Sequence, residues 1–171
     1  MDILALDVAT KTGWASNSGK VLRSGITSFA IKRGESPGMR FLRCRSWLEE
    51  VYGLLNKKVN VIVYEQAQHR GGAATMVCVG LVTEVQAFAS KYNIEMMPVH
   101  TGTLKKFSTG NGRASKKDMV KAAKKKGWKP EDHNEADAQL LLEYAMYELN
   151  VKKRREIKRR KKIRKIKRRE K

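Results

Sequence analysis

Three acidic residues lie at positions from which their carboxylates could act together in one site. Asp7 ends the apolar run ILAL, and Glu65 ends the β-branched run VNVIVY. Short apolar runs bounded by turn residues are typical of buried strands, so each acid is a charge at the end of a core strand. Asp137 lies between Ala136 and Ala138, where the last predicted helix should face the sheet. The three acids are therefore candidates for one cluster.

Carboxylates in such a cluster need partners. A buried carboxylate costs several kcal/mol unless it is paired, hydrogen-bonded or bound to a metal, and three close carboxylates cannot all ionise without a cation. Oxygen ligands favour Mg²⁺ or Mn²⁺ over zinc. Two such ions about 4 Å apart would serve phosphodiester cleavage, one activating water and the other stabilising the leaving oxygen. The alternative for Asp7 alone is that it caps the turn after its strand.

An acid-rich turn opens the last predicted helix. Asp132 is a natural N-cap, and a first turn with Asp132 and Glu135 also complements the helix dipole. That interpretation does not explain Asp137. Residues three or four apart share a helix face, so His133 and Asn134 are expected beside Asp137 while Glu135 points elsewhere.

Basic residues surround a glycine-containing segment at 110–112. Ammonium groups and backbone amides in such a segment can meet a phosphate group, although solvated surface charges would look the same in the sequence. The residues concerned are Lys105, Lys106, Arg113, Lys116 and Lys117.

The elements that must position these side chains follow from apolar periodicity and turn residues. A turn at 11–13 separates the first strand from strands at 14–18 and 20–30, and Ser36 is expected to cap the helix that follows. Strands at 59–64 and 94–99 flank a helix at 73–91, and a loop with one short helical turn covers 100–112. Ser115 is expected to cap a helix that Gly127 closes. This order predicts an α/β domain on a mixed sheet.

The charge is unevenly distributed along the chain. The 171 residues carry a net charge of +20, of which +13 lies in residues 151–171 and +7 in residues 1–150. We therefore expect one domain over 1–150 and a basic C-terminal tail over 151–171, helical or disordered in isolation. A charge this large indicates a polyanionic partner, with nucleic acid the commonest, although a solvated tail is the alternative.

The apolar runs, the N-terminal residues and the two cysteines indicate the cellular compartment that we expect for the protein. We find no uninterrupted run of about 18 apolar residues and no signal peptide pattern at MDILALD, so no membrane segment is expected. Cys44 and Cys78 form no ligand motif and read as reduced thiols, which predicts a cytoplasmic protein. The helix at 73–91 is apolar on more than one face, which fits either burial in its own domain or a partner subunit.

Four segments together resemble a known family. The segments are LALDVATKTGWA, VNVIVYEQ, LKKFSTGNGRASKKDMVKAA and HNEADAQLLLEYA. In this order and spacing over residues 1–150 they are similar to the RuvC-type Holliday junction resolvases, of the phage or bacterial branch. The resemblance implies an RNase H-like fold with a mixed five-stranded sheet flanked by helices, in a homodimer. It also implies Mg²⁺-dependent paired nicking of four-way DNA junctions that leaves 5′-phosphate and 3′-hydroxyl ends.

The resemblance also assigns roles to single residues. The three clustered acids match three of the family's four metal positions. The fourth position, Asp or His in the family, is Asn134 here, so either His133 or Asp132 substitutes or the ligand is neutral.

Further matches concern DNA contact. Lys105 and Lys116 match lysines near the scissile phosphate. In the loop after Glu65 the family often has an aromatic that stacks on bases, whereas this chain offers His69 or Arg70.

Two other functions fit the same residues. One is a broader nuclease for flaps and replication forks. The other is a catalytically silent protein that binds branched DNA, for which the neutral Asn134 is the main support.

Overall fold

The computed structural model describes residues 1–66 and 72–167, with side chains placed except at 158 and 161–167. Its centre is a five-stranded sheet in the order β3-β2-β1-β4-β5. The strands are β1 (Ile3–Asp7), β2 (Lys11–Ser16), β3 (Arg23–Ser28), β4 (Val61–Glu65) and β5 (Glu95–Val99). Strands β1, β2 and β3 pair antiparallel, whereas β4 runs parallel to both β1 and β5. The predicted mixed sheet is confirmed.

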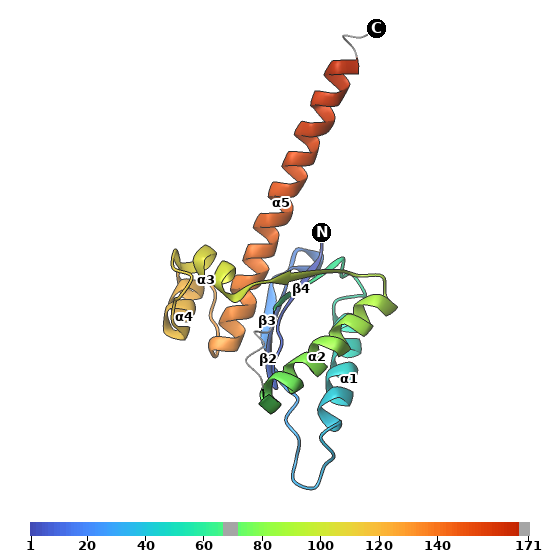
Figure 1. Cartoon of the computed structure of the whole chain (residues 1–171), viewed down its shortest axis with the longest axis vertical. Coiled ribbons are helices and arrows are strands. Elements are labelled where there is room, and N and C mark those ends of the chain that lie inside the picture. Colours follow the sequence, from blue (N-terminus) through green and yellow to red (C-terminus); the bar gives the residue numbers. More distant parts are fainter. Residues whose placement is uncertain (67–71, 168–171) are drawn as a thin grey trace.

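Helices cover both faces of the sheet (Figure 1). Helices α1 (Met39–Leu54) and α2 (Gly72–Lys91) pack on each other over one face. Helix α5 (His133–Lys167) crosses the other face, and α3 (Thr101–Thr109) and α4 (Lys116–Lys125) pack beside it. A short 3-10 helix, η1 (Ser18–Lys20), joins β2 to β3.

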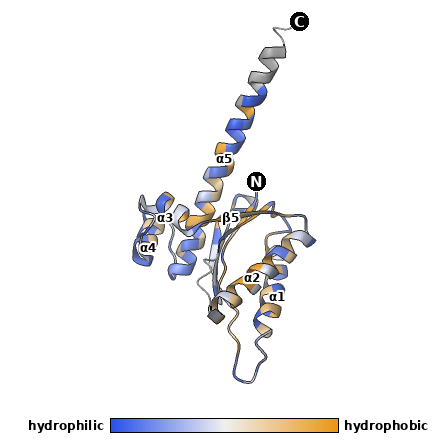
Figure 2. Cartoon of the chain, viewed as in Figure 1, coloured by the Kyte–Doolittle hydropathy of each residue, from blue (hydrophilic) through white to orange (hydrophobic). Residues whose placement is uncertain are grey.

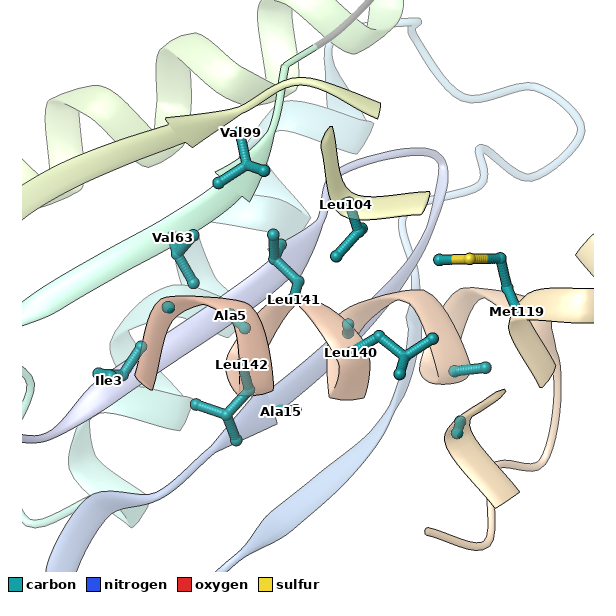
Figure 3. Close-up of a cluster of buried hydrophobic side chains, with 14 of the residues drawn as sticks. Ile3, Ala5, Ala15, Val63, Val99, Leu104, Met119, Leu140, Leu141 and Leu142 are labelled. Carbon is teal, nitrogen blue, oxygen red and sulfur yellow. The ribbon is translucent and has the colours of Figure 1, made fainter. Parts of the chain in front are cut away.

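The alternation of side chains along β1 separates two hydrophobic cores. Leu4 and Leu6 point into the core under α1 and α2. Ile3 and Ala5 point the other way, into the core under α5. Figure 3 shows this second core, with Leu141 of α5 over the sheet residues. Side chains of odd number in β1 therefore face α5.

Four sequence predictions about local structure were wrong. Residues 101–109 form helix α3 and not a loop with a single turn. Strand β2 begins at Lys11, because Thr12 closes the preceding turn by donating to the Ala9 carbonyl at 2.7 Å. Strand β3 begins at Arg23 and not at residue 20, since η1 occupies Ser18–Lys20. Helix α1 starts at Met39, after the predicted Ser36 cap. The caps at Ser115 and Asp132 are confirmed.

Helix α2 is apolar yet largely exposed. By length and composition alone it is long and apolar enough to cross a membrane, although polar residues interrupt its apolar sequence. One side packs into the core through Leu81, Val85 and Phe88. Met76 and Val79 stay exposed. Through this packed side, α2 forms part of the core of the α/β domain.

Helix α5 continues without a break through residue 150. It projects beyond the sheet as a single rod up to Lys167, and the coloured part of the helix beyond the sheet is mostly hydrophilic in Figure 2. The sixteen residues from 152 to 167 extend it by about 24 Å at 1.5 Å per residue. The basic extension is therefore helical through Lys167, and the predicted boundary at residue 150 is not a break in the backbone.

Candidate active site

Strand register places the first two acids side by side. Leu6 of β1 pairs with Tyr64 of the parallel strand β4, so Asp7 and Glu65 are the next residues along these neighbouring strands. Because side chains alternate, both acids share the face of Ala5 and Val63, which pack under α5. Ligands gather at the carboxyl ends of strands in open α/β sheets, and this edge holds both acids.

The third acid arrives on α5, because that helix comes very close to the sheet. Gly13 of β2 faces the start of the helix, where a Cβ atom on Gly13 would lie 2.0 Å from the Asn134 carbonyl oxygen. Ala136 and Ala138, which follow in the same turn of α5, are completely buried in the core between this helix and the sheet. These small residues let α5 approach closely enough to bring Asp137 over the strand ends.

The acids line one cleft of about 290 Å³. All seven residues predicted for the catalytic and metal site contribute to its walls: Asp7, Glu65, Lys105, Lys116, His133, Asn134 and Asp137. Thr101, at the start of α3, also lines the cleft and donates a hydrogen bond to Glu65 Oε1 at 2.5 Å. Thr101 was not predicted, although it follows β5 just as the two acids end their strands.

Burial and mutual repulsion make this cleft unfavourable for negative charge. The pKa of Asp7 is raised well above its usual value, first by burial and then by Asp137 and Glu65. The pKa of Asp137 is raised to about 7, first by burial and then by Glu65, while Lys105 and Lys116 act in the opposite direction. Asp137 Oδ1 is also buried and has no hydrogen-bond partner among the described residues. The arrangement calls for a cation or for protons.

The fourth position is distinguished by its hydrogen bonds. Asp132 does not line the cleft, because it caps α5 and forms an ion pair with Lys11 at 2.8 Å. His133 Nε2 lies 2.8 Å from Lys116 Nζ, so a neutral His133 accepts a hydrogen bond from the ammonium group. Asn134 donates through its amide to Asp132 at 3.1 Å, which leaves its side-chain carbonyl oxygen for the cleft. Of the three candidates, Asn134 alone both lines the cleft and has a side-chain oxygen to offer there.

The carboxylate and amide oxygens of the cleft fit a hard divalent cation that keeps part of its water shell. Among the residues that the structure describes, no three His, Cys, Asp or Glu side chains converge into a ready-made ion cage. Mg²⁺ usually keeps several waters and takes only one or two carboxylates from the protein, so pairs of these acids suffice. The unpartnered Asp137 oxygen is the group that such an ion would satisfy.

Glu135 has a structural role that the sequence did not reveal. It is 5% exposed, and its carboxylate accepts hydrogen bonds from Ser24 Oγ at 2.6 Å and from the Glu131 amide at 2.7 Å. Gln139 donates to the same Ser24 hydroxyl at 2.9 Å. Glu135 points away from the cleft as predicted, but it ties the first turn of α5 to β3 instead of merely facing the helix dipole.

The remaining predicted DNA contacts lie outside the cleft. Lys106, Arg113 and Lys117 are exposed and do not line it. His69 and Arg70 lie outside the described residues. None of these five residues belongs to the cleft walls that the structure describes.

Comparison with solved structures defines the fold. RuvC of Thermus thermophilus, solved in complex with a Holliday junction substrate, has a TM-score of 0.71 and 18% identity, over 86% of this chain and 94% of that one. A second T. thermophilus RuvC structure has a TM-score of 0.65 and 17% identity, over 83% and 91%. No family model and no curated protein matches the sequence. The chain has an RNase H-like fold of the RuvC type.

Proposed function

We propose that this protein is a metal-dependent, structure-selective endodeoxyribonuclease that resolves Holliday junctions. The observation that supports this most is the meeting of Asp7, Glu65 and Asp137 in one cleft with two lysines, on a RuvC-type fold. Because the T. thermophilus protein was solved with a Holliday junction substrate, a four-way junction is the first substrate to consider.

Asp7, Glu65, Asp137 and the Asn134 carbonyl would hold two Mg²⁺ ions, for which Mn²⁺ could substitute. When bound, the metal supplies an activated water and a positive charge at the leaving oxygen. Thr101 keeps Glu65 oriented through its hydrogen bond. A cation held by these side chains would offset both the burial of the acids and their mutual repulsion, the two causes that raise the pKa values of Asp7 and Asp137.

Lysines in the cleft would bind the scissile phosphate. Lys105 and Lys116 line the cleft beside Asp137 and carry the charge needed to offset that of the pentavalent transition state. His133 holds Lys116 in place through the 2.8 Å contact. Hydrolysis would leave a 5′-phosphate and a 3′-hydroxyl, and Lys106, Arg113, Lys117, His69 and Arg70 would contact the flanking DNA.

Paired, symmetric nicks need two active sites, and we assign the second to an identical subunit. Helix α2 exposes Met76 and Val79, and Leu42 of the adjoining helix α1 is also exposed. An exposed apolar surface of this kind is typical of a protein interface. The α1 and α2 face is therefore the proposed dimer surface.

The test is cleavage of a synthetic four-way junction beside a linear duplex of the same sequence. We expect symmetric nicks in the junction alone, with Mg²⁺ and not with chelator. Cleavage of flaps and forks at the same rate would make the protein a general branched-DNA nuclease. An absence of cleavage in Mg²⁺ and in Mn²⁺ would contradict the proposal.

A protein that binds branched DNA without cutting it is the second candidate, because Asn134 brings no negative charge to the fourth position. Asn134→Asp tests this directly. If the natural protein binds junctions tightly without cutting them and the variant cuts, the silent binder is correct. If both cut, with the variant needing less Mg²⁺, the nuclease is correct.

A further inference from the structure

A second polar groove lies between α3 and α4, and it shares no residue with the acidic cleft. Its volume is about 490 Å³. One wall is the end of α3, with Ser108 and Thr109. The other is a stripe of α4 at helical spacing, formed by Asp118, Lys121 and Lys125 among others.

Two lysines in this groove have charges that no ion pair within the described residues neutralises. Lys121 and Lys125 are one helical turn apart and exposed, and neither forms an ion pair within the described part of the chain. Lys126, at the groove's end, differs because it pairs with Glu143 at 3.3 Å and lies 5.2 Å from the centre of the Phe107 ring. The free positive charge of the groove is thus at Lys121 and Lys125.

The other polar groups leave room for an anion there. The groove's one acid, Asp118, accepts hydrogen bonds from the Ser115 amide at 2.9 Å and the Ser115 hydroxyl at 2.7 Å. These hydrogen bonds are the main cause of its lowered pKa, and the charge of Lys121, one turn further along α4, adds to it without forming an ion pair in the described part of the chain. Ser108 Oγ is buried and has no hydrogen-bond partner within the described residues. Because that hydroxyl is buried, an anion in the groove would be attracted by the exposed Lys121 and Lys125 and not by Ser108.

We propose that the α3–α4 groove is a second DNA-binding site, in which Lys121 and Lys125 hold backbone phosphates of the DNA. This inference rests on the proposed function for the identity of the polyanion. Helix α4 would then contact DNA on two sides, because Lys116 at its first residue lines the acidic cleft. Lys121 and Lys125 lie about 7.5 and 13.5 Å further along the helix at 1.5 Å per residue.

The test measures the salt dependence of binding. The full-length variant Lys121→Gln/Lys125→Gln is compared with Lys57→Gln/Lys58→Gln, whose exposed lysines precede β4 at the end of the sheet opposite the cleft. Affinity for a fluorescent four-way junction is measured in chelator between 50 and 300 mM KCl. Since each phosphate contact contributes about 0.9 to the slope of log affinity against log salt, the groove variant should lose about two units of slope. The control variant should keep the natural slope.

Two single variants sharpen the result. Lys126→Gln should lose less affinity than Lys121→Gln, because Glu143 already neutralises Lys126. Ser108→Ala should leave both the affinity and the urea midpoint unchanged, since the natural hydroxyl is buried and has no partner within the described residues. An unchanged slope in the double variant, or equal losses in both double variants, would overturn the proposal.

Junction cleavage by the natural protein separates this proposal from the previous one. If the protein cuts junctions and the double variant keeps its slope, the groove is not a DNA site while the nuclease stands. If the slope falls and the protein does not cut, the groove binds DNA and the nuclease proposal fails.

Discussion

Asp7 and Asp137 are held in the folded chain at the expense of stability. Both acids are shielded from water and face each other and Glu65. In the absence of metal their pKa values rise, so the folded state takes up protons that the unfolded chain releases. The groups best placed for metal binding are thus also the groups that oppose folding at neutral pH.

The first prediction concerns metal-free stability against pH. Because the pKa of Asp137 rises from its usual 3.8 to about 7, stability should fall as the pH rises from about 4 through 7. Asp137→Asn removes this penalty, so in chelator at pH 8 the variant should be more stable than the natural protein by about 2 kcal/mol or more. The two proteins should converge near pH 4.

Urea unfolding at both pH values, with and without Mg²⁺, checks this. Mg²⁺ at pH 8 should stabilise the natural protein more than the variant. A variant that is less stable than the natural protein at pH 8 would show that Asp137 is not strained in the fold.

Residue types at strand ends made much of the site predictable. Asp7 and Glu65 were identified because a charge at the end of an apolar strand is unusual, and Asp137 because it lies between two alanines on the helix side expected to face the sheet. The contact of Lys116 with His133 and the burial of Glu135 were not predictable, because they depend on how α4 and β3 pack against α5. Such contacts join residues far apart in the chain and leave no local pattern.

At the scale of elements, the approach of α5 to β2 controls the site. Gly13 leaves no space for a side chain, since the atoms nearest to an added Cβ belong to the Asn134 backbone. Backbone cannot rotate away as a side chain can. A change at Gly13 therefore displaces the helix that carries both Asn134 and Asp137.

The second prediction compares two glycines. Gly13→Ala should destabilise the protein by about 1–3 kcal/mol, as overpacking does, and should weaken Mg²⁺ binding. Gly53→Ala is the control, because Gly53 lies within α1 with nothing within 4 Å of an added Cβ, and alanine should stabilise that helix by about 0.5–1 kcal/mol. Chemical denaturation measures both effects. Equal midpoints for the two variants would rule out the close contact at Gly13.

Strand periodicity and helix caps made the α/β order predictable, whereas two elements were missed for physical reasons. Helix α3 has only nine residues, and Leu104 is the one among them that is buried. So short an apolar face gives no helical period in the sequence. The 3-10 helix η1 depends on Gly19 and Lys20, which both have positive φ. Neither feature shows in a pattern of apolar residues.

At the scale of the whole molecule, α5 joins the acidic cleft to the basic extension in one rod (Figure 1). The residues from 152 onward carry fifteen basic and two acidic side chains. Such a helix has too few apolar residues to pack on the domain, and its charge favours a polyanion. We expect it to bind DNA without regard to sequence.

The third prediction is that deleting residues 152–171 will flatten the salt dependence of junction binding. The slope of log affinity against log salt should fall by about three units or more, while the urea midpoint stays unchanged. A variant of full length with eight of the basic residues changed to Gln controls for length and should behave like the deletion. A natural slope in both variants would mean that the extension does not touch DNA.

The measurement that tests the central claim most directly is Asp7→Asn on a four-way junction, with binding and cleavage measured on the same preparation. Asp7 faces Glu65 and Asp137 in the cleft, and asparagine keeps its shape while removing its charge. The account predicts that cleavage in Mg²⁺ falls at least about a thousand-fold while the affinity for the junction in chelator changes by less than about three-fold. Cleavage at the natural rate by Asp7→Asn would contradict the assignment of this cleft as the active site.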